Sequence, residues 1–164
     1  MNQPPSSLNE EEIGRIILDS AFKVHNALGP GLLESVYESA LAAELKKRSL
    51  TVERQKPIPV EYDGQLLDVA FRADLMVNKL VLVELKSVET ITPLFKKTVT
   101  SYLKLIPLRL GFLINFNETH LKNGIVRVTR GLEGKDFFAH ANKPLEVDFR
   151  KPSLSSRSSR DIRT

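Results

Sequence analysis

The stretch VLVELKS, Val81 to Ser87, has the composition of a buried strand and yet contains an acid and a base. Residues two apart in a strand point to the same face, so Glu84 and Lys86 share one face. The other face carries the apolar residues Val81, Val83 and Leu85. Burying ionised groups is costly unless they are paired or bind a metal. The stretch therefore indicates a functional site, with an exposed ion pair on a solvent-facing strand as the alternative.

The residues before this strand predict a hairpin that adds a second acid. The run from about 66 to 77 is extended, and a three-residue turn over Asn78 to Leu80 would place Asp74 opposite Glu84. Directly opposed like charges destabilise a sheet, so unless one of the acids is protonated we expect a positive group between them. Lys86 supplies part of that charge, and a divalent cation would supply the rest. Oxygen ligands favour Mg²⁺ or Mn²⁺ over Zn²⁺. A two-residue turn would weaken this inference.

Caps, turns and hydrophobic periodicity predict helices and strands around the hairpin. Asp63-Gly64 marks a second hairpin turn, and Pro57 and Pro59 restrict the strand before it to an edge or irregular position. Helices are predicted over about 9–28, 32–48 and 92–106, and strands over about 51–62, 66–77, 80–88, 108–116 and 124–130. This order predicts an α/β or α+β fold in which helices sandwich a sheet.

Composition narrows the class of protein. The 164 residues suffice for one ordinary domain, and the absence of cysteine excludes disulfide scaffolds, zinc fingers, iron–sulfur clusters and thiol nucleophiles. The three histidines are scattered, which argues against a histidine-built zinc site. The sequence has no apolar run long enough to cross a bilayer and does not begin with a secretion signal. We therefore expect a cytoplasmic protein without a membrane partner.

The charge balance is compatible with a polyanionic partner but does not require one. The net charge is +4, with a pI near 9.4. Part of the excess lies in RKPSLSSRSSRDIRT, Arg150 to Thr164, which has the composition of a disordered segment. This tail is interpreted as a solvated end, with a nonspecific nucleic-acid arm as the alternative.

Asp74, then nine hairpin residues, then Glu84-Leu85-Lys86, resembles the D…(E/D)xK core of the PD-(D/E)XK nuclease superfamily. FRADLMV followed by LVLVELKS is similar to its GxxExxY branch, whose naming motif matches GLLESVY at residues 31–37. The resemblance extends from about residue 13 to 130 and includes YLKL at 102–105 and GFLINF at 111–116. It implies an α/β fold with a restriction-endonuclease-like core, a mixed central β-sheet flanked by α-helices.

The resemblance also implies a role for each matching residue. Asp74 and Glu84 would bind Mg²⁺ or Mn²⁺, with the backbone carbonyl of Leu85 as a further ligand. Lys86 would be the catalytic lysine, which orients the attacking water or stabilises the developing charge. Glu34 resembles the acid that many members direct into the site from an N-terminal helix.

Two further residues have both a functional and a structural interpretation. Tyr37, three residues after Glu34, is on the same helical face and either contacts a phosphate, holds Glu34 or is a core aromatic. Arg72 shares a strand face with Asp74, which suits a phosphate contact or an ion pair.

One departure from the family pattern concerns the helix after the E-x-K strand. This chain has Phe95 and Thr98 where the branch has polar residues, so either other residues supply the auxiliary contacts or catalysis is weakened. The candidates for these contacts are Lys96, Lys97 and Tyr102.

These observations lead to a metal-dependent nuclease that hydrolyses nucleic acid, with DNA expected before RNA. A catalytically weakened nucleic-acid-binding or assembly module and an interaction domain without a nucleic-acid role are the alternatives. A homodimer would suit the cleavage of two strands, although no heptad or exposed stripe indicates one. The expected organisation is a flexible N-terminus over 1–8, a nuclease-like domain over 9–135 and an extension with a basic tail over 136–164.

Overall fold

The computed structural model describes residues 7–132 and 146–148 of the chain. The predicted helices and strands are all present, with ends within a few residues of those expected, and η1 and β6 are additions. In chain order the elements are α1 (Glu10–Leu28), α2 (Glu34–Lys47), β1 (Val52–Tyr62), β2 (Gln65–Val77), β3 (Val81–Lys86), α3 (Pro93–Leu105), β4 (Leu110–Asn115), the 3₁₀ helix η1 (Leu121–Gly124), β5 (Ile125–Thr129) and β6 (Glu146–Asp148). The predicted basic tail lies outside the described residues.

Local sequence chemistry explains where α1 begins and ends. Asn9 Oδ1 accepts a hydrogen bond from the Glu12 N–H at 3.0 Å, and Glu12 Oε2 accepts one from the Asn9 N–H at 2.8 Å. This reciprocal pair is the predicted capping box. The helix ends at Gly29, whose φ of 68° is readily adopted only by glycine.

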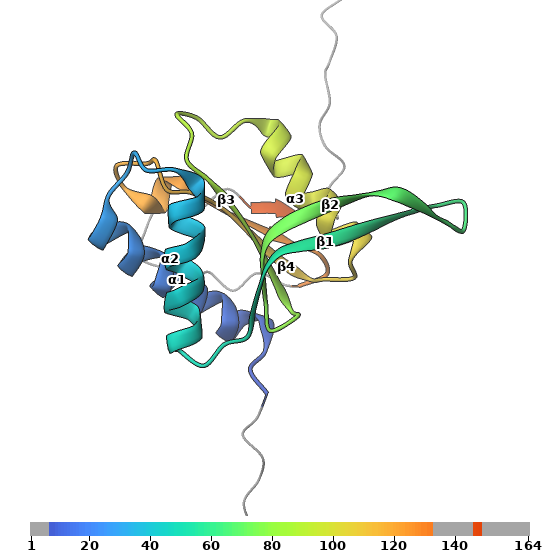
Figure 1. Ribbon diagram of the computed structural model, residues 1–164, viewed down its shortest axis with the longest axis horizontal. Helices are drawn as coiled ribbons and strands as arrows, with labels where there is room; N and C mark the ends of the chain where they lie inside the picture. The colour runs from blue at the N-terminus through green and yellow to red at the C-terminus, as the bar shows by residue number, and fades with distance from the viewer. Residues whose placement is uncertain (1–6, 133–145, 149–164) are drawn as a thin grey trace, which may run out of the picture.

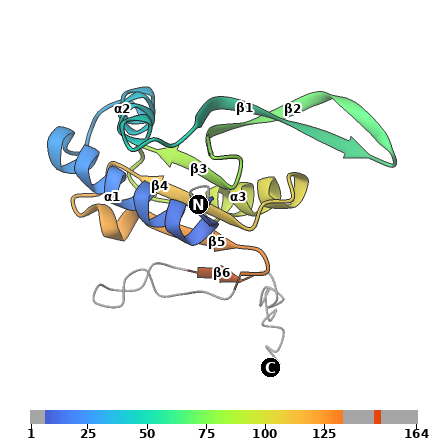
Figure 2. The ribbon, with the colours of Figure 1, turned by 90° about the horizontal axis from the view of Figure 1, so that it is seen from below.

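The strands form one mixed sheet in the order β1-β2-β3-β4-β5-β6 (Figure 1 and Figure 2). The β3–β4 and β5–β6 pairs are parallel, and the other neighbours are antiparallel. Parallel neighbours need a crossover, and α3 provides it between β3 and β4. The α/β fold with a mixed sheet flanked by helices is therefore confirmed.

Helices cover both faces of the sheet and create two apolar layers. One layer packs α1 and α2 against one sheet face, with Ile17, Leu41 and Phe112 among its fully buried side chains. The other packs α3 against the opposite face, with Leu82 and Leu103 buried there. Within the described residues, none of the helices combines the length and the apolar composition that a membrane-spanning helix requires.

Strands β1 and β2 continue beyond the sheet as a two-stranded ribbon (Figure 2). Strand β2 pairs with β3 only from Leu75 to Val77, and the pairs Leu75 with Val83 and Val77 with Val81 are those predicted. Asn78, at a φ of 49°, begins the turn that fixes this register. The ribbon therefore separates from β3 immediately before Leu75, at the position of Asp74.

Candidate functional site

The two acids of the predicted site lie where β2 and β3 separate. Asp74 and Glu84 are the next residues beyond the Leu75–Val83 pair in the predicted register, but the ladder ends before them and the two residues do not pair. Instead, Asp74 Oδ2 accepts a hydrogen bond from the Leu85 N–H at 2.7 Å. The Asp74 carboxylate thus provides the acceptor that a backbone carbonyl of β2 would provide if the ladder continued.

Burial gives both carboxyls unusual protonation behaviour. Glu84 is only 6% exposed, and its Oε2 has no hydrogen-bond partner among the described residues. Burial, and then the charge of nearby Asp74, raise the pKa of Glu84 to about 7, against the opposing effect of Lys86. Burial also raises the pKa of Asp74, although the hydrogen bond from Leu85 acts in the opposite direction. The acids are therefore close enough to repel each other.

The ammonium group of Lys86 lies between two carboxylates and an aromatic ring. Its Nζ is 3.5 Å from Glu84 Oε1 and 3.7 Å from Glu34 Oε1. The same atom lies 5.1 Å from the centroid of the Phe95 ring, which is a cation–π distance. Phe95 thus contacts the lysine directly.

The start of α2 positions Glu34. Its Oε2 accepts a hydrogen bond from the Ser87 N–H at 3.4 Å, and the Ser87 hydroxyl donates to the Leu32 carbonyl at 2.6 Å. The Tyr37 hydroxyl donates to the Gly29 carbonyl and accepts from the Leu32 N–H. These bonds connect the α1–α2 loop to the end of β3.

Tyr37 itself is fully buried, and its ring stacks on Phe116 with centroids 4.6 Å apart. A side chain in this position has no surface for a phosphate contact. The structural interpretation of Tyr37 as a core aromatic that fixes the loop before Glu34 accounts for these contacts.

Sequence reasoning did not identify three polar residues that support Asp74. Gln55 Nε2 donates to Asp74 Oδ1 at 3.3 Å and to Glu38 Oε2 at 2.7 Å. Arg54 Nε donates to the other oxygen of Glu38 at 2.8 Å. A chain of polar contacts thus runs from α2 through β1 to Asp74.

The family model described as PD-(D/E)XK nuclease superfamily matches residues 11–128, most of the chain. The chain belongs to the PD-(D/E)XK nuclease superfamily. Searches of curated proteins and of solved structures find no match.

Members of the PD-(D/E)XK superfamily typically use divalent metals, and the acid pair of this chain suits such an ion in part. Two repelling carboxylates, one with a buried oxygen that lacks a hydrogen-bond partner among the described residues, form a hard oxygen donor set. A cation would neutralise both. Within the described part of the chain, no group of three histidine or acidic side chains is arranged to hold a metal. Asp74 and Glu84 would therefore need backbone or water oxygens to complete the coordination.

The structure places the other predicted nucleic-acid contacts on β2 and α3. Tyr102 is 6% exposed, and burial followed by the charges of Glu84 and Asp74 raises its pKa, which places it near both acids. Arg72 and Lys97 are exposed on β2 and α3, and Lys96 is half-buried. The Thr98 hydroxyl donates to the Leu94 carbonyl within α3 at 3.0 Å.

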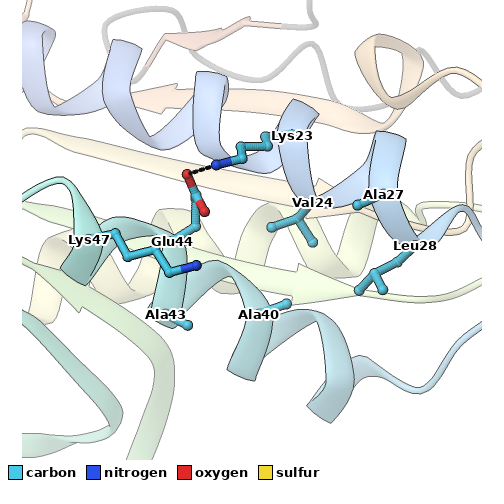
Figure 3. Close-up of a pocket in the computed structure, with 8 residues that line it drawn as sticks. All are labelled: Lys23, Val24, Ala27, Leu28, Ala40, Ala43, Glu44 and Lys47. Atoms are coloured by element: carbon cyan, nitrogen blue, oxygen red, sulfur yellow. Dashed lines mark hydrogen bonds and ion pairs between the residues drawn. The ribbon is translucent and has the colours of Figure 1, made fainter.

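A pocket of about 260 Å³ lies elsewhere, between α1 and α2 (Figure 3). Its lining is mainly apolar, and the Lys23–Glu44 ion pair of 2.8 Å lies at its edge. None of the acids around Lys86 lines it. The pocket therefore lacks the donor set expected at a PD-(D/E)XK reaction centre.

Proposed function

We propose that this protein is a metal-dependent nuclease that hydrolyses phosphodiester bonds in nucleic acid, with DNA as the preferred substrate. The observation that carries the proposal is the convergence of Asp74, Glu84 and Lys86 at the point where β2 leaves β3. Membership of the PD-(D/E)XK superfamily supports the same reaction class.

In this proposal Asp74, Glu84 and the Leu85 carbonyl hold Mg²⁺ or Mn²⁺. The bound cation would polarise the scissile phosphate and lower the pKa of a water molecule. Lys86, held between Glu84 and Glu34, orients the attacking water and stabilises negative charge that develops on the phosphate. The Phe95 ring, whose centroid is 5.1 Å from the Lys86 Nζ, limits the movement of the lysine.

We also assign the chain to the GxxExxY branch, with GLLESVY at residues 31–37 as the motif. One backbone angle and two contacts support a role for this motif at the site. Gly31 adopts a φ of 94° in the loop, the Tyr37 hydroxyl holds that loop, and Glu34 reaches Lys86. The Glu34 side chain is 44% exposed, so it lies on the solvent-facing side of the site, where it acts as an auxiliary acid.

The proposed nucleic-acid contacts are Arg72 on the ribbon together with Lys96, Lys97 and Tyr102 on α3. The Phe71 ring on β2 and the Tyr102 ring on α3 have centroids 5.5 Å apart, so the ribbon and α3 are in contact. Phosphate contacts by the three cations, Arg72, Lys96 and Lys97, predict binding that weakens steeply as salt rises. Cytoplasmic residence, a homodimer and a domain over 9–135 followed by a basic tail stay predictions.

The test compares cleavage and binding for the Lys86→Ala variant. Purified protein is incubated with plasmid DNA, single-stranded DNA and an RNA transcript in Mg²⁺, Mn²⁺ or EDTA, and binding is measured separately by fluorescence anisotropy. We expect wild-type protein to cleave DNA only with a divalent ion. Lys86→Ala should abolish cleavage while it preserves binding.

Lys46→Ala is the matched control, because Lys46 is an exposed lysine in the last turn of α2 and is far in sequence from Asp74, Glu84 and Lys86. This variant should cleave like the wild type. Binding without cleavage in any metal would instead support the inactive binding module. Equal cleavage by Lys86→Ala and wild type would contradict the catalytic role of the lysine.

A further inference from the structure

Gln55 has a backbone conformation that is unusual inside a strand. Its φ is +49°, in the left-handed region that non-glycine residues rarely adopt. The ladder pairs Arg54 with Leu75 and Lys56 with Ala73, so Gln55 lies opposite Asp74. Such strain persists where surrounding contacts fix it, and it is concentrated at functional sites.

The side chain of Gln55 bridges two acids from different elements. Its Nε2 is 2.7 Å from Glu38 Oε2 on α2 and 3.3 Å from Asp74 Oδ1 on β2. Glu38 is only 7% exposed, and Arg54 fixes its other oxygen at 2.8 Å. Glu38 therefore holds the Gln55 amide in a position from which it donates to Asp74.

Together with β3, this amide fixes both oxygens of Asp74. The Leu85 N–H holds Oδ2 and the Gln55 amide contacts Oδ1. Two hydrogen bonds to different oxygens define the plane of a carboxylate. The position of that plane decides which lone pairs face Glu84.

We propose that Gln55 is the positioning residue for Asp74: its strained backbone and its contact with Glu38 orient the Asp74 carboxylate for a divalent cation. The inference rests on the proposed function and adds a residue that supports the acid pair. Partners of this kind orient metal ligands, and their loss typically reduces metal affinity or activity about 10- to 100-fold.

The test uses two substitutions that both remove the amide but differ in whether they relieve the backbone strain at position 55. Gln55→Gly removes the amide and relieves the left-handed strain, whereas Gln55→Leu removes the amide and retains the strain. Ser49→Gly is the control, because Ser49 also has a positive φ, of 64°, but follows α2 away from the acids. Mn²⁺ affinity is measured by calorimetry and the unfolding midpoint of the metal-free protein by thermal melting.

Both Gln55 variants should bind Mn²⁺ about 10- to 100-fold more weakly, while Ser49→Gly binds normally. Gln55→Gly should melt no lower than wild type, so that lost affinity cannot be attributed to lost stability. Normal Mn²⁺ affinity in both Gln55 variants, with or without a lower midpoint, would overturn the positioning role alone. Failure of wild-type protein to bind Mn²⁺ would overturn the proposed function and, with it, this inference.

Discussion

Glu84→Gln should make the metal-free protein more stable at pH 8. The Glu84 side chain is buried, and its pKa in the folded protein is about 7, compared with 4.5 for an ordinary glutamate. The folded protein therefore binds the Glu84 proton more tightly than the unfolded chain does. This contribution to stability is fully present below about pH 4.5 and is lost as the pH rises through 7.

The size of the effect follows from the pKa difference. A rise from 4.5 to about 7 corresponds to about 3 kcal/mol of unfolding free energy at pH 8, at 1.36 kcal/mol for each pKa unit. Glutamine resembles the neutral acid in shape and carries no charge, so the variant avoids the free-energy cost of burying an ionised carboxylate. At pH 5 most of the wild-type Glu84 is protonated when folded, and the gain should be below about 1 kcal/mol.

The assay is urea unfolding in EDTA at pH 5 and pH 8. We expect the midpoint of Glu84→Gln to rise by about 1–2 M urea at pH 8 and to change little at pH 5. Glu44→Gln is the opposite control, because the buried Glu44 accepts hydrogen bonds from Lys23 at 2.8 Å and Arg48 at 3.3 Å and should lose stability. An equal gain at both pH values would refute the electrostatic reasoning and indicate a packing effect instead.

Three further predictions concern the same acids and their neighbours. Mn²⁺ affinity should fall about tenfold between pH 8 and pH 6, because protons compete for Glu84; a flat calorimetric pH profile would contradict this. Phe95→Leu should slow DNA cleavage about 2- to 5-fold by removing the ring near Lys86, and unchanged rates in single-turnover assays would argue against it. Asp74→Ala should lower the unfolding free energy by about 1–3 kcal/mol because the Leu85 N–H loses its acceptor, whereas Asp74→Asn should retain most of it in urea melts.

The hairpin that carries the acids was predictable because its determinants are local. Asn78 and Lys79 both adopt left-handed backbone angles, and the Leu80 N–H bonds to the Val77 carbonyl at 3.0 Å, which closes the turn. Once this turn is fixed, the alternation of side chains places Asp74 and Glu84 next to each other. Val81, Val83 and Leu85 of this stretch face the α1–α2 layer as the alternation predicts, and Leu82 faces the α3 layer.

The support for Asp74 was not predictable because it depends on an irregularity in the neighbouring hairpin. Tyr62 pairs with Gln65 at the tip, and a regular ladder from this turn would place Gln55 opposite Arg72. The register shift between Pro59 and Glu61 moves Gln55 to a position opposite Asp74 instead. The two prolines indicate irregular pairing but not its size.

The helical periodicity of the sequence also does not predict the contacts of α2. Helical spacing places Tyr37 on the same broad face as Glu34, yet Tyr37 is fully buried and Glu34 is 44% exposed. The difference arises because α2 begins at Glu34, at the edge of its packing surface. The position of Tyr37 is fixed by stacking of its ring on Phe116. Phe116 directly follows β4, far along the chain, so the helical periodicity of α2 does not reveal this contact.

The two proposed metal ligands differ in what they contribute to the fold. Asp74 replaces a strand partner for the Leu85 N–H, so its carboxylate stabilises the end of β3 even without a cation. Glu84 has a buried oxygen without a hydrogen-bond partner among the described residues, and its ionisation is a cost to the folded state. Burial raises the pKa of both acids, so a bound cation would offset the cost of ionising Glu84 and Asp74 alike, and Asp74 in addition provides the fixed geometry. The separation of β2 from β3 at this point creates both conditions, since a continued ladder would satisfy the Leu85 N–H from the backbone and fill the space beside Glu84.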